Sequence, residues 1–194
     1  MDDRVTRSAV IFDLDGTLTR PILDFDAIRA EIGGIQGPIL EALSALSFER
    51  RARAEAILER HEREAAQQAQ LYEGAVEVLA ECRRRGHPLA ILTRNARVNL
   101  FAVLERFGIT IDASRTREDG AIKPSPEPVL SLCAELGAAP ADSWMVGDFR
   151  FDIQSGRAAG AKTVLMIGDG PEPDYAHEAD HVISALPELL EVVG

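Results

Sequence analysis

Two aspartates at the end of an apolar run are the residues of this sequence best suited to chemistry. Asp13 and Asp15 are separated by one leucine, follow the apolar residues 9–12 and precede a Gly-Thr pair. An exposed aspartate has a pKa of about 4, so Asp13 is already an anion at neutral pH and can attack an electrophile without a base. The alternative is an Asx turn that does no more than close a strand.

Three later segments carry side chains that a phosphoryl-transfer site needs, each after a predicted strand. Thr93 offers a hydroxyl, Lys123 a fixed positive charge, and Asp148 and Asp152 offer carboxylates. Carboxylates, phosphate oxygens and water are the usual ligands of Mg²⁺. Each residue also has a local explanation, as a helix cap, a solvated loop charge or a charge at a helix N-terminus. Their joint occurrence at strand ends favours one ligand site, because the carboxyl ends of parallel strands meet at one edge of a sheet.

The pattern of elements outside one long insertion alternates between strands and helices. Apolar runs predict strands at 9–12, 88–92, 110–113, 143–146, 162–167 and 181–183. Helical spacing and flanking glycines predict helices at 73–85, 96–107, 126–136 and 152–159, with a last helix from about 186. This alternation predicts an α/β fold with a doubly wound, mainly parallel Rossmann-like sheet.

The segment between the first two strands is far longer than one crossover needs. The helix at 73–85 already supplies the crossover, so residues 20–72 are surplus. They read as helices near 25–32, 38–46 and 48–70, the last of which is highly charged and typical of a solvated face. We therefore predict a small helical cap at 20–72, inserted into a catalytic core made of 1–19 and 73–194.

Composition excludes some classes of partner. The 194 residues carry a net charge of −11, which argues against nucleic acid, and no apolar run is as long as a membrane span. Cys82 and Cys133 form no CxxC motif, as expected of reduced, buried thiols in the cytoplasm. We expect a cytoplasmic protein whose partner is a small phosphorylated metabolite.

These motifs resemble those of the haloacid dehalogenase superfamily, in its phosphoglycolate phosphatase-like branch with a short helical cap. DLDGT at 13–17 looks like the first motif, Thr93 the second, Lys123 the third, and GDFRFD at 147–152 the fourth. The second motif reads TRN, whereas many relatives place asparagine directly after the threonine. The superfamily's dehalogenases and phosphonatases lack the second aspartate of the first motif, so Asp15 points to phosphoester chemistry.

The resemblance implies a role for each matched residue. Asp13 would be the nucleophile that forms an aspartyl-phosphate, and Asp15 would protonate the leaving oxygen and later deprotonate water. The expected phosphate-binding residues are Thr93, Arg94, Asn95 and Lys123. Mg²⁺ would be held by the carboxylates of Asp13 and Asp148 and by the main-chain carbonyl of Asp15. Asp152 would bind the ion either directly or through water. The expected function is a Mg²⁺-dependent phosphatase acting on a small phosphomonoester.

Three other functions fit parts of the sequence. A sugar phosphomutase would use the same aspartates but return the phosphoryl group to a second hydroxyl. A phosphate-binding module without catalysis would use the same phosphate contacts. The segment HEADH at 177–181 fits the HExxH motif of zinc peptidases, which needs both histidines on one helix face, yet it runs into a predicted strand.

Overall fold

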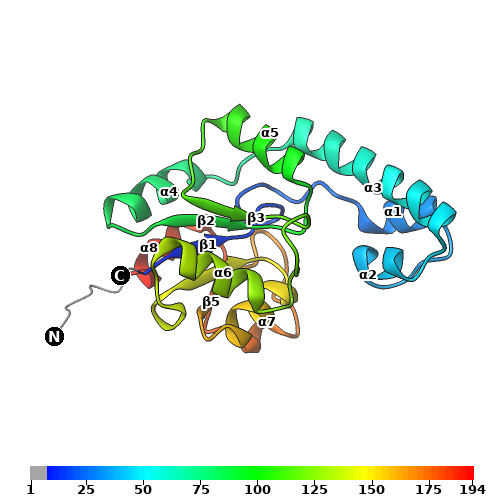
Figure 1. Cartoon of the computed structure of the whole chain (residues 1–194). Coiled ribbons are helices and arrows are strands. Elements are labelled where there is room, and N and C mark those ends of the chain that lie inside the picture. Colours follow the sequence, from blue (N-terminus) through cyan, green and yellow to red (C-terminus); the bar gives the residue numbers. More distant parts are fainter. Residues whose placement is uncertain (1–7) are drawn as a thin grey trace. The chain divides into compact units, whose positions relative to one another are not determined.

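A six-stranded parallel sheet organises the larger part of the molecule. The computed structural model describes residues 8–194 and divides the chain into two compact units, Ile22–Ala69 and the remainder (Figure 1). The strands of the larger unit are β1 (Val10–Phe12), β2 (Leu89–Leu92), β3 (Ala113–Arg115), β4 (Trp144–Gly147), β5 (Lys162–Met166) and β6 (His181–Ile183). Their order is β3-β2-β1-β4-β5-β6, and every pair is parallel. The predicted doubly wound parallel sheet is confirmed.

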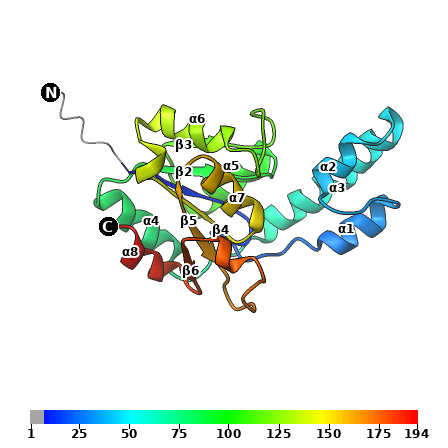
Figure 2. The ribbon, with the colours of Figure 1, turned by 90° about the horizontal axis from the view of Figure 1, so that it is seen from below.

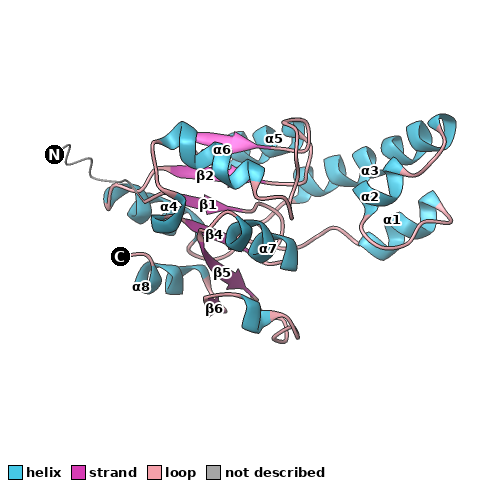
Figure 3. Ribbon diagram, turned by 60° about the horizontal axis from the view of Figure 1, so that its bottom comes forward, coloured by secondary structure: helices cyan, strands magenta, loops and turns pink. Residues whose placement is uncertain are grey.

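The order of the strands reverses direction beside β1. The chain runs outward from β1 through β2 to β3, then crosses to place β4 on the other side of β1 (Figure 3). Ligands of open α/β sheets bind at such a switch point, beyond the carboxyl ends of the strands. Here these are the ends of β1 and β4, which carry the predicted aspartates.

Helices cover both faces of the sheet (Figures 1 and 2). They are α4 (Ala75–Arg84), α5 (Arg97–Phe107), α6 (Glu127–Leu136), α7 (Arg150–Ala158) and α8 (Leu189–Val192), with 3-10 turns η1 (Pro140–Asp142), η2 (Ala176–Glu178) and η3 (Leu186–Glu188). Because both faces are covered, the central strands β1, β2 and β4 are buried along their whole length without alternation, and Ile11, Ala90 and Met145 lie together in a buried cluster with Leu132 of α6.

The third strand lies later in the chain than predicted. The prediction of a strand at 110–113 is wrong in position, because β3 begins only at Ala113, which pairs with Ala90. Asp112 instead belongs to the preceding loop and binds Leu89 twice. The Asp112 N–H donates to the Leu89 carbonyl at 2.8 Å, and the Leu89 N–H donates to Asp112 Oδ2 at 2.8 Å. Arg83 of α4 binds Thr110 and Asp112 in the same loop. The predicted last helix also proves to be a 3-10 turn followed by a single helical turn.

The smaller unit contains three helices, α1 (Phe25–Ile32), α2 (Ile39–Ser44) and α3 (Phe48–Gln68). Asp24 caps α1 by accepting hydrogen bonds from two main-chain N–H groups. Ile28, Leu43 and Leu58 belong to its own apolar cluster. Glu31 of α1 accepts hydrogen bonds from Arg60 and His61 of α3. The unit thus has a core and a polar tie of its own.

The two chain segments that connect the units pair with each other. Thr19 and Leu71 form an antiparallel bridge, and the Arg20 N–H donates to the Gln70 carbonyl at 2.8 Å. The chain therefore leaves and re-enters the larger unit at adjacent points. Among the described residues, no helix combines the length and apolar character that a bilayer crossing requires. Cys82 and Cys133 are both buried and free, as predicted.

Candidate active site

The loop that follows β1 lies against the end of β4. The Asp13 N–H donates to the Val146 carbonyl at 2.8 Å, so the chain continues along β4 past the last strand residue. Gly16 has φ 86°, and a Cβ at this position would lie 2.2 Å from Asp148 Oδ2. Only glycine therefore permits this turn to approach Asp148 so closely. Thr17 adds a hydrogen bond to Asp148 Oδ1 at 3.3 Å.

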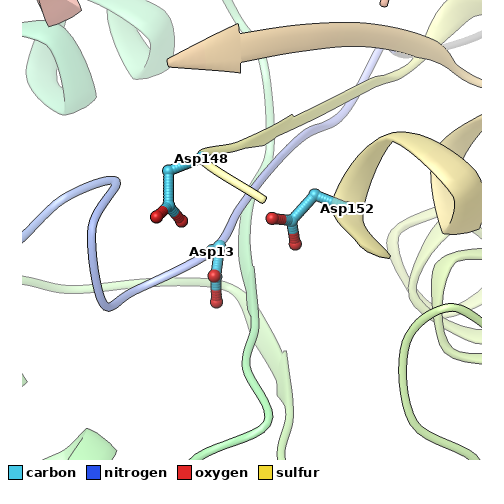
Figure 4. Close-up of side chains that lie close together, drawn as sticks. All are labelled: Asp13, Asp148 and Asp152. Atoms are coloured by element: carbon cyan, nitrogen blue, oxygen red, sulfur yellow. The ribbon is translucent and has the colours of Figure 1, made fainter. Parts of the chain in front are cut away.

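The turn from β4 into α7 supplies two more carboxylates. Asp148 follows the strand directly, and Asp152 lies in the first turn of α7, where its Oδ2 accepts the Phe149 N–H at 3.0 Å. A Cβ on Gly147 would lie 2.1 Å from the Asp152 carboxyl carbon, so the absence of a side chain there makes room for Asp152. Figure 4 shows the carboxylates of Asp13, Asp148 and Asp152 around one space, with an oxygen of each within 4.8 Å of the others.

Lys123 reaches this cluster from the loop before α6. Its side chain is 2% exposed, and Nζ lies 2.8 Å from Asp13 Oδ1 and 2.5 Å from Asp152 Oδ1. Nζ also donates to the Leu92 carbonyl at 2.8 Å. Burial alone would lower the pKa of Lys123, but the two carboxylates outweigh it and raise the pKa above its ordinary value. Lys123 is thus a buried cation, and its interpretation as a solvated loop charge is wrong.

Three carboxyl groups of the site, those of Asp15, Asp148 and Asp152, have raised pKa values. Burial and the nearby Asp13 and Asp152 raise the pKa of Asp148 well above its ordinary value. Burial raises the pKa of Asp152 to about 6, although Lys123 acts in the opposite direction. Burial also raises the pKa of Asp15 to about 6, against a hydrogen bond from Asn95 that lowers it. Ionised, the cluster would hold more negative charge than Lys123 offsets, and all its donors are hard oxygens. These residues therefore fit Mg²⁺.

The loop after β2 brings the TRN segment to the same edge of the sheet. Thr93 is buried, and its Oγ1 accepts the Asn95 N–H at 3.0 Å. Arg94 donates to the Lys123 carbonyl at 2.6 Å, with its guanidinium 4.8 Å from the centre of the Phe151 ring. Asn95 Nδ2 donates to Asp15 Oδ2 at 2.8 Å. The three residues thus join the Lys123 loop to the first motif.

The structure brings the predicted site residues together, some by direct contact and some through intermediates. Lys123 touches Asp13 and Asp152, whereas Asp15 and Thr93 are connected through Asn95. The catalytic, phosphate-binding and metal-binding roles of all these residues stay predictions, including phosphate binding by Arg94 and Asn95 and metal binding by the Asp15 carbonyl.

Sequence reasoning missed residues that hold this site in place. Tyr175 donates to the main-chain carbonyl of Asp148 at 3.3 Å, and nothing in the sequence signals that contact. Asn99 donates to Asn95 Oδ1 at 2.9 Å. Its position one helical turn after Asn95 is a signal that could have identified it.

The HEADH segment does not form a metal-binding helix. His177 and Glu178 lie in the 3-10 turn η2, whereas His181 begins strand β6. His177 Nδ1 lies 2.8 Å from the Asp174 carbonyl oxygen, and the His181 ring lies 5.7 Å from that of Trp144. Because the two histidines do not share a helix face, the zinc-peptidase hypothesis is wrong.

Comparison with known proteins identifies the family. Residues 8–160 match the model of the haloacid dehalogenase-like hydrolases. The chain belongs to this family. It is 30% identical to the pyrophosphatase PpaX of Bacillus velezensis, over 100% of this chain and 98% of that protein. It is also 30% identical to the N-acetylmuramic acid 6-phosphate phosphatase of Pseudomonas aeruginosa, covering 98% and 96% of the two chains.

Solved protein structures share the fold of this chain. A hydrolase from Pseudomonas syringae superposes with a TM-score of 0.77 at 21% identity, covering 95% of this chain and 97% of that one. The predicted resemblance to the family, and with it the prediction of a hydrolase with a Rossmann-like core, is confirmed.

Proposed function

We propose that this protein is a Mg²⁺-dependent phosphatase that hydrolyses a small phosphomonoester through an aspartyl-phosphate intermediate. The observation that carries the proposal is Asp13, bound to the buried Lys123 ammonium at 2.8 Å and grouped with Asp148 and Asp152. An anionic nucleophile beside a fixed cation suits attack on a phosphoryl group, whose charge the cation partly offsets. The names of the two curated relatives, a pyrophosphatase and a phosphatase, agree with a small phosphorylated substrate.

The chemistry runs in two steps. An Asp13 oxygen forms a bond to phosphorus as the bond from phosphorus to the leaving oxygen breaks, and Asp15 donates its proton to that oxygen. In the second step Asp15 takes a proton from water, the water oxygen attacks phosphorus, and Asp13 leaves with inorganic phosphate as the product. A pKa of about 6 suits Asp15 to both steps, because each protonation state is accessible near neutral pH.

The remaining site residues would bind the metal ion and the phosphoryl group and offset their charge. Asp13 and Asp148 would hold Mg²⁺ through their carboxylates, together with the Asp15 carbonyl, and Asp152 would bind it directly or through water. When bound, the cation supplies positive charge next to the phosphoryl oxygens. Thr93 would donate its hydroxyl hydrogen to the phosphoryl group, since its oxygen already accepts the Asn95 N–H. Lys123 and Arg94 would supply the other side-chain donors, whereas the Asn95 side chain, which is hydrogen-bonded to Asp15, would act on Asp15.

We assign the Ile22–Ala69 unit as a cap that selects the substrate. Its support is the insertion point, directly after the first motif, and the paired connecting segments. The buried, free thiols of Cys82 and Cys133 are consistent with a reducing cytoplasm.

Release of inorganic phosphate from a panel of phosphomonoesters, with Mg²⁺ and with chelator, tests this function. We expect turnover of at least one small ester that depends on Mg²⁺. Isomerisation that depends on a bisphosphate and releases no phosphate would identify a phosphomutase instead. Specific binding of phosphate with no turnover of any ester would favour the binding module.

A further inference from the structure

Two asparagines form a hydrogen-bonded chain that ends on Asp15. Asn95 donates from Nδ2 to Asp15 Oδ2 at 2.8 Å. Its side-chain oxygen Oδ1 accepts two hydrogen bonds, from the Ala96 N–H at 2.7 Å and from Asn99 Nδ2 at 2.9 Å. Asn95 is 5% exposed and Asn99 4%, so water offers little competition for these bonds.

These bonds determine which end of the Asn95 carboxamide faces Asp15. A half turn of the amide would place its oxygen against the Asp15 carboxyl group and its NH₂ against two other donors. All three hydrogen bonds would then be lost, and burial makes unmade bonds costly. Asn95 therefore presents an N–H donor to Asp15, and Asn99 helps to keep it so.

The main chain around Asn95 is anchored as well. Its N–H donates to Thr93 Oγ1 at 3.0 Å, and its carbonyl accepts the Arg117 N–H at 3.4 Å. Asn99 lies in the first turn of α5, and Asn95 directly precedes the N-cap residue Ala96 of that helix. The donor aimed at Asp15 is thus held before any substrate arrives, which is the condition for a precise catalytic geometry.

We propose that Asn95, supported by Asn99, is the positioning residue of Asp15. It occupies Oδ2 and fixes the carboxyl plane, so that Oδ1 is the oxygen that gives its proton to the leaving group. A neutral carboxyl group and a carboxylate both accept a hydrogen bond at Oδ2, so the contact persists through both steps of the cycle. This proposal rests on the proposed function, in which Asp15 is the acid and base.

The dependence on the leaving group tests the proposal. An alkyl phosphate needs a proton on its leaving oxygen, whereas 4-nitrophenyl phosphate releases a stabilised anion without one. For Asn95→Ala we expect kcat/KM for the alkyl ester to fall about 10- to 100-fold, a part of the usual contribution of a general acid. The value for 4-nitrophenyl phosphate should fall less than about 3-fold. The ratio kcat/KM is used because it reports the steps up to departure of the alcohol.

Two further variants frame that result. Asp15→Asn should show the same selectivity for the alkyl ester with a larger loss. Asn99→Ala, in which a buried asparagine is removed without touching Asp15, should show it with a smaller loss and remains informative if Asn95→Ala does not fold. Equal losses for both esters in the Asn95 and Asn99 variants would mean a structural role only and would overturn the proposal.

A crystal structure of Asn95→Ala decides the positioning independently of turnover. A second rotamer or spread density for Asp15 supports the proposal, and an unmoved Asp15 carboxyl group overturns it. If the wild-type protein releases phosphate from no ester of the whole panel, the proposed phosphatase function fails, and this structure still decides whether Asn95 positions Asp15.

Discussion

Among the single residues of the site, Lys123 contacts two carboxylates and affects each in a different way. Its ammonium contacts Asp13 at 2.8 Å, which orients that carboxylate, and offsets part of the charge of the buried Asp152. A buried charge that keeps its partners is tolerated, but one that loses them is strongly destabilising. Substitutions that preserve the shape and hydrogen-bonding capacity of the carboxylates are therefore the informative ones.

We expect Asp13→Asn to abolish turnover in a folded protein. The amide is a poor nucleophile, yet it is nearly isosteric and its oxygen can still accept from Lys123. Phosphate release should fall by about 10³-fold or more, while thermal unfolding remains a single cooperative transition. Phosphate release and calorimetry on the same samples measure both. Rates close to wild type in a folded variant would remove Asp13 from the nucleophile's role.

Most of the candidate site residues could be predicted because each follows an apolar run. Asp13, Thr93 and Asp148 stand directly beyond β1, β2 and β4, so the strand pattern alone places them at one edge. The contacts of Asn99 and Tyr175 could not be inferred in the same way. The Tyr175 contact spans 27 residues and depends on how the loop after β5 folds back.

The junction between β4 and α7 shows how an element positions a functional group. Gly147 is the last residue of β4, and Asp152 occupies the space that a side chain on Gly147 would fill. Asp152 in turn holds Lys123 at 2.5 Å. A change in the strand backbone would thereby displace Asp152 and, with it, the Lys123 ammonium beside Asp13.

Gly147→Ala should therefore reduce both stability and activity. Overpacking costs about 1 to 3 kcal/mol, and displacement of Asp152 should lower kcat about 10-fold or more. Gly137→Ala is the matched control, since Gly137 closes α6 at φ 64° with nothing within 4 Å of an added Cβ. It should cost about 1 kcal/mol of stability through its backbone conformation alone and leave kcat unchanged. Denaturant unfolding and phosphate release compare the two, and equal effects would contradict the role of Gly147.

Removal of the Ile22–Ala69 unit should leave a folded core. Arg20 and Gln70 are hydrogen-bonded neighbours, so a short Gly-Ser linker can join the chain across the deletion. We expect selectivity between large and small phosphomonoesters to decrease, because a cap shapes the site and excludes water. Ratios of kcat/KM across an ester series, with circular dichroism as the folding control, measure this. Unchanged ratios in a folded deletion variant would refute the assignment as a cap.

Element boundaries were predictable where a local signal marks them. The helix predicted at 126–136 is found at Glu127–Leu136, because Gly137 ends it in a left-handed conformation. The strand at β3 was misplaced because its start depends on the distant pairing of Ala113 with Ala90. The β-propensity of residues 110–112 is no lower than that of residues 113–115, so local propensity could not decide which of the two segments forms the strand.

For the molecule as a whole, the acidic site affects the response of stability to pH. The ordinary pKa of aspartate is 3.8, and the folded protein raises the pKa of Asp15 and Asp152 to about 6 and that of Asp148 well above its ordinary value. Between about pH 4 and these raised values the folded state binds more protons than the unfolded state. The free energy of unfolding therefore decreases as pH rises through this window.

We expect metal-free wild-type protein to lose stability between pH 5 and pH 8. A group whose pKa is raised to about 6 contributes about 1.4 kcal/mol to this loss, because only the one pKa unit between pH 5 and pH 6 lies within the measured range. Asp148→Asn removes one of the shifted groups, so its stability should fall less over the same range. Urea unfolding in chelator at fixed ionic strength measures both proteins. Stability of the wild type that rises from pH 5 to pH 8 would contradict the electrostatic description of the site.

Four surface carboxylates have lowered pKa values and therefore change the free energy of unfolding with pH only at lower pH, which is why the measured range begins at pH 5. They are Glu31, Glu81, Asp119 and Glu178.

Mg²⁺ should reverse this loss, because a cation that binds the assembled cluster stabilises the folded state alone. At about 100 times its dissociation constant the ion adds about 2.7 kcal/mol, and a protein of this size gains about 2 to 4 °C in melting temperature per kcal/mol. The shift should be larger at pH 8 than at pH 6, since the ion must displace protons from Asp148 and Asp152.

Asp148→Asn should reduce both the Mg²⁺-dependent shift in melting temperature and the activity. Asp169→Asn, which changes a carboxylate that is 89% exposed and outside the cluster, should retain both. Melting curves of the three proteins in Mg²⁺ and in chelator, at fixed ionic strength, provide the comparison. An equal shift in the Asp148→Asn protein and the wild type would mean that the cation binds elsewhere.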